Sequence, residues 1–179
     1  MIRRTVMMLT LLATAACTPP GPPPTLPGAS DAMVGRDPIV TVGQNVVAFF
    51  RAPQANQPAA AARAIAELEW LADTLPSNPR WQTASGTGLN ELAQARWEAR
   101  NALGISSRAP AQAVINGLSA AAVAIEANNQ TALAAALPRN IFPLGPAGTV
   151  QKLSAPPSVP SVMQAAWSLS GGGSGPRRR

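Results

Sequence analysis

Residues 58–75 read PAAAARAIAELEWLADTL, and this stretch decides the fold. Its apolar side chains recur at spacings of four, three, four and three residues, which places them along one side of a helix. They are Ala61, Ile65, Leu68, Ala72 and Leu75. Pro58 lies early in the expected helix, where its missing N–H matters least, and Pro76 and Pro79 are expected to end it. The pattern therefore predicts an amphipathic helix that packs against other helices.

An earlier segment has its own start and stop signals. Asp37 followed by Pro38 is a favourable pair for the beginning of a helix, and Pro53 is expected to follow its end. The apolar residues in between fall on one helical face. Because the segment is rich in Val and contains Gly43, a strand over residues 39–42 is the alternative.

Two later segments are also expected to be helices. One begins at Thr87 or Gly88 and ends at Gly104, a natural C-terminal cap. The other begins near Pro110 and ends by Asn128. Its apolar residues repeat the spacing of the first stretch, at Ala111, Ile115, Leu118, Ala122 and Ile125.

Shorter helices are expected at 130–137 and 160–169, with an irregular but ordered strap between them. The predicted fold class is all-α, a small Ala-rich antiparallel bundle of about four helices plus short C-terminal helices, spanning residues 37–169. Because Ala buries little area, stability should depend on a few large side chains. The expected ones are Phe49, Phe50, Leu68, Leu92, Trp97, Ile115 and Leu118.

The composition excludes several kinds of chemistry. The chain of 179 residues has no His and one Cys. Without His there is no Ser-His-Asp or Cys-His catalysis and no His-ligated metal or haem. A single Cys excludes an intrachain disulfide framework and a CxxC site. We therefore expect no catalytic residue, no metal site and no cofactor, and hence no enzyme.

Most of the net charge of +6 comes from the two ends of the chain. Once the five terminal arginines are set aside, nine basic and eight acidic residues remain, so the body is nearly neutral. Those arginines are Arg3, Arg4, Arg177, Arg178 and Arg179. A nucleic-acid interface needs a basic face with stacking aromatics, so no nucleic-acid partner is expected. The three C-terminal arginines are candidate contacts for anionic head groups.

Residues 1–16 have the features of a secretory signal peptide. A pair of arginines precedes twelve apolar and small residues, too few to span a bilayer. Thr14, Ala15 and Ala16 then lead into Cys17, and Pro-rich chain follows. This arrangement resembles the lipobox of bacterial lipoproteins. The resemblance implies cleavage before Cys17 and attachment of lipid to that residue. The alternative is ordinary signal cleavage at an A-x-A site, which would leave a soluble periplasmic or secreted protein.

The resemblance also implies a place in the cell. A lipid on Cys17 would anchor the chain in the bacterial cell envelope, facing the periplasm, and Thr18 after it implies the outer membrane. Residues 17–36 are then the anchor and a Pro-rich tether, which is expected to be extended and outside the fold. Residues 170–179 are expected to be a flexible Gly/Ser tail that ends in arginines.

Candidate sites in the body are few. Glu69 and Asp73 share a helix face and with Trp70 suggest a paired-carboxylate glycosidase. The alternative is two exposed ion pairs, Glu69 with Arg100 and Asp73 with Arg96, across an antiparallel hairpin.

Two tryptophans are expected to have a role at the surface. Trp81 lies in a polar loop and is a candidate partner contact, and Trp167 lies on the last short helix, which docks on the body or on a partner.

Three functions follow from these patterns. The first is a lipid-anchored, non-catalytic structural or interaction module of the envelope, with an envelope protein as partner. The second is a periplasmic module that binds an apolar ligand in a cavity lined by Leu, Ile and Trp. The third is a cell-wall glycosidase that uses carboxylates alone.

Overall fold

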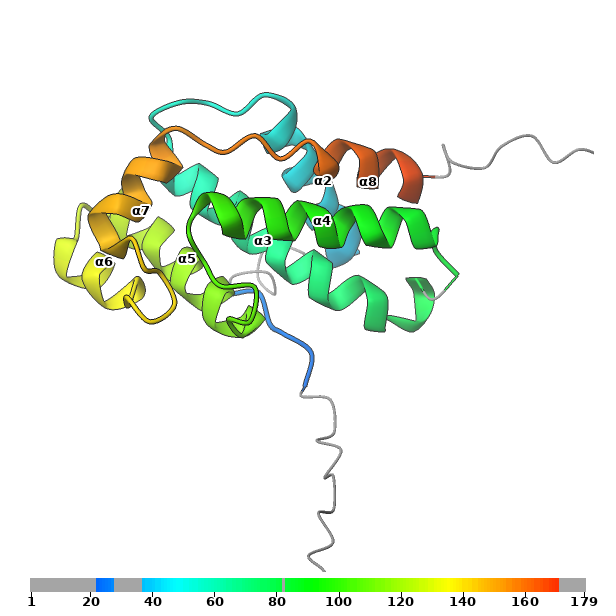
Figure 1. The fold of residues 1–179 in the computed structure, drawn as a ribbon, viewed down its shortest axis with the longest axis horizontal. Helices are drawn as coiled ribbons and strands as arrows, with labels where there is room; N and C mark the ends of the chain where they lie inside the picture. The colour runs from blue at the N-terminus through cyan, green and yellow to red at the C-terminus, as the bar shows by residue number, and fades with distance from the viewer. Residues whose placement is uncertain (1–21, 28–36, 82, 171–179) are drawn as a thin grey trace, which may run out of the picture.

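The computed structural model describes residues 22–27, 37–81 and 83–170. All regular secondary structure in these residues is helical, and the helices pack against one another, as the sequence predicts (Figure 1). The elements are α2 (Pro38–Arg51), α3 (Pro58–Ser77), the 3-10 turn η1 (Pro79–Trp81), α4 (Gly86–Ala102), α5 (Ala111–Glu126), α6 (Gln130–Ala136), α7 (Gly145–Ser154) and α8 (Ser161–Leu169). None of the described helices is both long and apolar enough to cross a membrane.

Helix α3 is the centre of the fold, because α2, α4, α5 and α7 all pack against it. Of its twenty residues, eleven are buried. The side-chain contacts show that α3 is antiparallel to α4 and α5. Arg63 near its start pairs with Glu126 at the end of α5, and Asp73 near its end pairs with Arg96 of α4. Residues 58–75, which decide the fold, therefore lie in the helix against which four other helices pack.

The helices begin and end where local chemistry favours it. The Asp37 carboxylate accepts a hydrogen bond from the Ile39 N–H at 3.0 Å, and Pro38 opens α2, as the sequence predicts. Residues 39–42 are helical, so the alternative of a strand is wrong. Gly104 follows α4 with a φ of +67°, the left-handed conformation typical of a glycine after a helix.

Some predicted boundaries need correction. Helix α4 begins at Gly86, slightly earlier than expected, because the Ser85 hydroxyl caps the Gly88 N–H. Pro76 lies inside the last turn of α3 and does not end it. The expected irregular strap contains helix α7, which the Gly and Pro residues at its start obscured in the sequence.

The core depends on one large residue that the sequence analysis did not single out. Phe142 is fully buried, and its ring lies against Gly117 of α5. Of the side chains expected in the core, Leu68, Leu92, Ile115 and Leu118 are buried, and Phe49 and Phe50 pack partly buried against the core. The expectation for Trp97 is wrong, because it is 52% exposed.

Helix α8 is fixed to α4 at both of its ends. At its start, the Ser161 hydroxyl donates to Glu98 of α4 at 2.7 Å. At its end, Leu169 lies so close to Gly88 that a Cβ there would be 2.7 Å from the Leu169 Cγ. The two helices are therefore antiparallel, and α8 is docked on the body, the first of the two arrangements expected from the sequence.

The contact between Gly117 and Phe142 gives a test of the packing. A Cβ at position 117 would lie 2.5 Å from the Phe142 ring and 2.9 Å from the Ala136 carbonyl oxygen. Gly117→Ala should therefore lower the free energy of unfolding by about 1–3 kcal/mol, as overpacking usually does. The control is Gly43→Ala, also in a helix, where nothing lies within 4 Å of the new methyl group. That substitution should stabilise by about 0.5–1 kcal/mol. Equal effects of the two substitutions in urea unfolding would contradict this account.

Candidate functional site

An apolar groove of about 420 Å³ lies between α2 and α8. Leu71 and Leu75 of α3 and Leu92 of α4 contribute to its lining from beneath the two flanking helices. Val46 and Val47 of α2 and several residues of α8 line it as well. Its volume falls within the roughly 300–1,000 Å³ typical of small-molecule sites, which are mostly apolar with a few polar groups.

The groove exists because small residues face it from both helices. Helix α2 presents Gly43 and Ala48, and α8 presents Ala165 and Ala166. Nothing lies within 4 Å of a Cβ built on Gly43. Side chains of this size cannot fill the space between two helices held apart by the larger leucines and valines. The small residues on both helices therefore leave space that larger side chains would fill.

Arg51 is the single charged residue among the described residues that line the groove. It lies in the last turn of α2 and its side chain is exposed. Gln44 and Ser170 contribute further polar groups to the lining. The groove is therefore apolar along its length, with a guanidinium available at one end of α2.

Trp81 also lines the groove, where it is partly buried. It was expected in a polar loop as a surface contact, and the structure places it in the turn η1 beside the start of α2. Its Nε1 atom is buried and has no hydrogen-bond acceptor among the described residues. An unpaired buried donor costs about 1–3 kcal/mol, which a ligand acceptor or a water molecule would offset.

An ion pair holds η1 beside α2. The Arg80 guanidinium lies 2.6 Å from Asp37, the residue that caps α2. Burial of Asp37 acts to raise its pKa, but hydrogen bonds from Arg80 and from the Ile39 N–H outweigh this and lower it. The carboxylate is thus ionised at neutral pH and pairs with Arg80, the residue next to Trp81. Helix α2 also contacts α3 through a hydrogen bond that Asn45 donates to Glu67. Burial raises the pKa of Glu67 despite this hydrogen bond.

The second aromatic candidate, Trp167, is 62% exposed on α8. It does not line the groove, although its neighbour Ala166 does. Cys17, Arg177, Arg178 and Arg179 lie outside the described residues. The structure therefore brings one of the predicted site residues, Trp81, to the groove.

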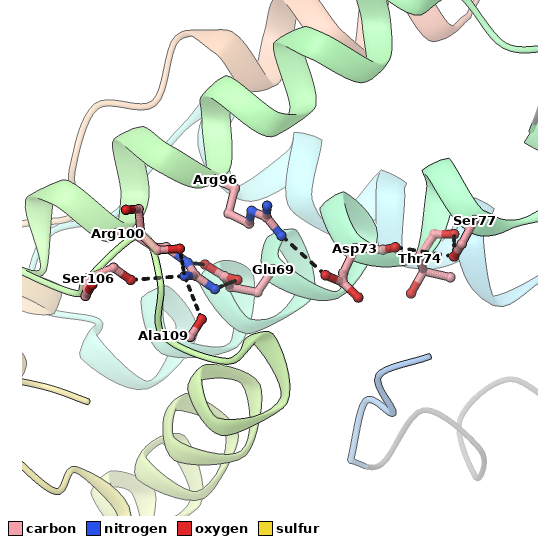
Figure 2. A network of polar contacts seen from close by, with 9 residues as sticks. Glu69, Asp73, Thr74, Ser77, Arg96, Arg100, Ser106 and Ala109 are labelled. Atoms are coloured by element: carbon pink, nitrogen blue, oxygen red, sulfur yellow. Dashed lines mark hydrogen bonds and ion pairs between the residues drawn. The ribbon is translucent and has the colours of Figure 1, made fainter. Parts of the chain in front are cut away.

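The carboxylates predicted as an acid pair are each paired with an arginine (Figure 2). The Glu69 carboxylate accepts two hydrogen bonds from Arg100, at 2.6 Å and 2.8 Å. Asp73 lies 3.4 Å from Arg96. Both pairings are those expected for an antiparallel hairpin of α3 and α4.

The expected exposure of the first pair is wrong. The side chains of Arg100 and Glu69 are 5% and 0% exposed, because α5 and the chain leading to it cover them. The Nη1 group of Arg100 is satisfied by backbone carbonyls. It donates to Ser106, Ser107 and Ala109 at 2.9–3.1 Å. A glycosidase needs carboxyl groups that face a substrate, and Glu69 is enclosed in this network.

Within the part of the chain that the structure describes, no three acidic, His or Cys side chains come together as a metal site. A scan against protein-family models found no match for this chain, and searches of curated proteins and of solved structures found none either. Any function must therefore be argued from the groove and from the sequence.

No local pattern in the sequence predicts the groove, because its two sides come from segments more than one hundred residues apart. The available clue was small residues on helices that also carry Val, Ile and Leu. Arg51 could not be identified as a groove residue from the sequence, because an arginine is common in the last turn of a helix.

Glu69→Ala and Asp73→Ala form a matched test of the two ion pairs. Removing Glu69 leaves the Arg100 charge buried without its partner, so the free energy of unfolding should fall by about 3–5 kcal/mol. Removing Asp73 from its partly exposed pair should change it by at most about 1 kcal/mol. Urea unfolding of both variants measures the difference. Similar small losses would show that the Glu69–Arg100 pair has no special weight.

Proposed function

We propose that this chain is a lipid-anchored, non-catalytic module of the bacterial cell envelope, and that its groove binds one aliphatic chain with an acidic head group. The groove between α2 and α8 carries the second part of the proposal. It combines a volume typical of ligand sites, an apolar lining with Leu, Ile and Trp, and a single cation. The lipobox-like Thr14–Cys17 supports the first part.

The ligand class follows from the shape and charge of the lining. An aliphatic chain contributes roughly 0.8 kcal/mol for each CH₂ group that it buries, so an apolar groove favours it without any specific polar contact. The Arg51 guanidinium presents several N–H donors to a carboxylate or phosphate. Because Arg51 is exposed, its contribution should be modest, and the acyl chain should supply most of the affinity.

The groove is tested by binding of dodecanoate to the chain from Cys17 onward, at concentrations where the fatty acid is monomeric. Ala166→Trp places a large side chain in the groove and should weaken binding at least about ten-fold, or about 1.4 kcal/mol. The control is Gln164→Trp, an exposed position on the same helix that does not line the groove. Calorimetry that shows no binding, or equal binding by both variants, would refute the ligand.

The head group has its own test within the same assay. Arg51→Gln should reduce the preference for dodecanoate over dodecanol by about two- to five-fold, the range for an exposed ion pair. Arg108→Gln, an exposed arginine that does not line the groove, should leave the preference unchanged.

The anchor is tested separately by intact mass and membrane fractionation in the native host. We expect a mature chain that begins at Cys17 and carries acyl mass, found in membranes. Cys17→Ala should release the protein from membranes, whereas Thr18→Ala should leave it anchored. A soluble chain without acyl mass would discard the anchor and would leave the groove in a diffusible periplasmic binding protein.

A further inference from the structure

Part of the Pro-rich segment is bound to the folded body. From the sequence, residues 17–36 are expected to lie outside the fold, but residues 22–27 lie along α3 and α5 (Figure 1). The Trp70 indole of α3 donates its N–H to the Pro24 carbonyl oxygen at 3.0 Å. The side chain of Leu26 packs against the core.

Gln112 of α5 holds the next residue by both of its polar atoms. Its Oε1 accepts from the Thr25 N–H at 2.7 Å, and its Nε2 donates to the Thr25 carbonyl at 2.9 Å. The amide of Gln112 thus satisfies both backbone groups of Thr25, as a neighbouring strand would. We call these contacts of Pro24 and Thr25 the clip.

The clip changes the reach of the proposed anchor. Asp37 lies twenty positions after Cys17, so an extended tether could hold the body about 60 Å away, at ~3.1 Å per residue. Pro22 lies only five positions after Cys17. Fully extended, this stretch spans at most about 18 Å. A clipped segment therefore keeps the body close to the bilayer.

The clip also implies an orientation of the folded body relative to the membrane. In Figure 1, residues 22–27 lie below the helices, and α8 lies above α4 in the upper part of the view, with α3 and α4 in between. We propose that the clip holds the face around Pro24, Thr25 and the start of α5 against the lipid surface, with α8 directed away from it. This inference rests on the lipid anchor proposed above.

The test uses the single Cys of the chain. The protein from Cys17 onward is coupled through that thiol to a maleimide-headgroup lipid in nanodiscs that also contain a gadolinium-chelating lipid. Amides at the start of α5 should then be broadened much more strongly than those of α8. Thr25→Pro removes the Thr25 N–H without altering the helical body, and Gln112→Ala removes both Gln112 contacts. Each should reduce the difference between the two faces at least about two-fold. Gln151→Ala, at an exposed position of α7, is the matched control and should not.

Each outcome has a distinct meaning. Equal broadening of the amides on both faces of the unaltered protein would overturn the clip. Clip variants that show the same broadening as the unaltered protein would also overturn it. Because coupling bypasses cellular processing, these results do not depend on native acylation. If the native chain carries no lipid, the proposed orientation at a membrane is wrong. Unequal broadening of the two faces would still establish the clip itself.

Discussion

The fold depends on the ion pair between Glu69 and Arg100. A buried charge is tolerated only where it is paired and hydrogen-bonded, and here both oxygens of Glu69 and all three side-chain nitrogens of Arg100 have partners. The pair fixes α4 against α3 in one register. Through the carbonyls of Ser106, Ser107 and Ala109 it also fixes the chain that leads into α5. One guanidinium of α4 thus contacts both α3 and the chain that leads into α5.

This constraint matters because the helices themselves are not very specific. Alanine seams permit close approach but bury little area, so several registers would have similar energies. A polar network that is satisfied in only one arrangement removes the alternatives. The close fit of Phe142 against Gly117 acts in the same direction at the other side of α5. Where neither a large side chain nor a polar contact fills the space, between α2 and α8, a groove remains.

Much of the helical architecture could be predicted from the sequence. The 4-3 spacing and the Asp37–Pro38 start give α2, α3 and α5, because these signals are local. The pairing of Glu69 and Asp73 with Arg100 and Arg96 could also be predicted, since both pairs are four residues apart on adjacent helices. Their difference in burial could not, because it depends on how α5 and the chain before it cover α3 and α4.

The failures have different physical causes. Trp97 was expected in the core from its residue type, but it lies on the exposed side of α4. Helix α7 was missed because Gly145 and Pro146 resemble loop sequence, although proline is favourable in the first turn. The groove and the clip arise from contacts between distant segments, for which a single sequence has no local pattern.

The proposals combine into one arrangement. The clip would place one face of the body at the membrane, and the groove between α2 and α8 would be directed away from that face. An acyl-binding module held in this way would receive its ligand from the periplasmic side.

The most direct test of this account is to locate the ligand. The protein from Cys17 onward, with labelled methyl groups, would be studied by NMR in the presence of dodecanoate. The account predicts nuclear Overhauser contacts from the aliphatic chain to the methyl groups of Leu71, Leu75 and Val162, which line the groove. Contacts to methyl groups elsewhere, or none at saturating ligand, would contradict it.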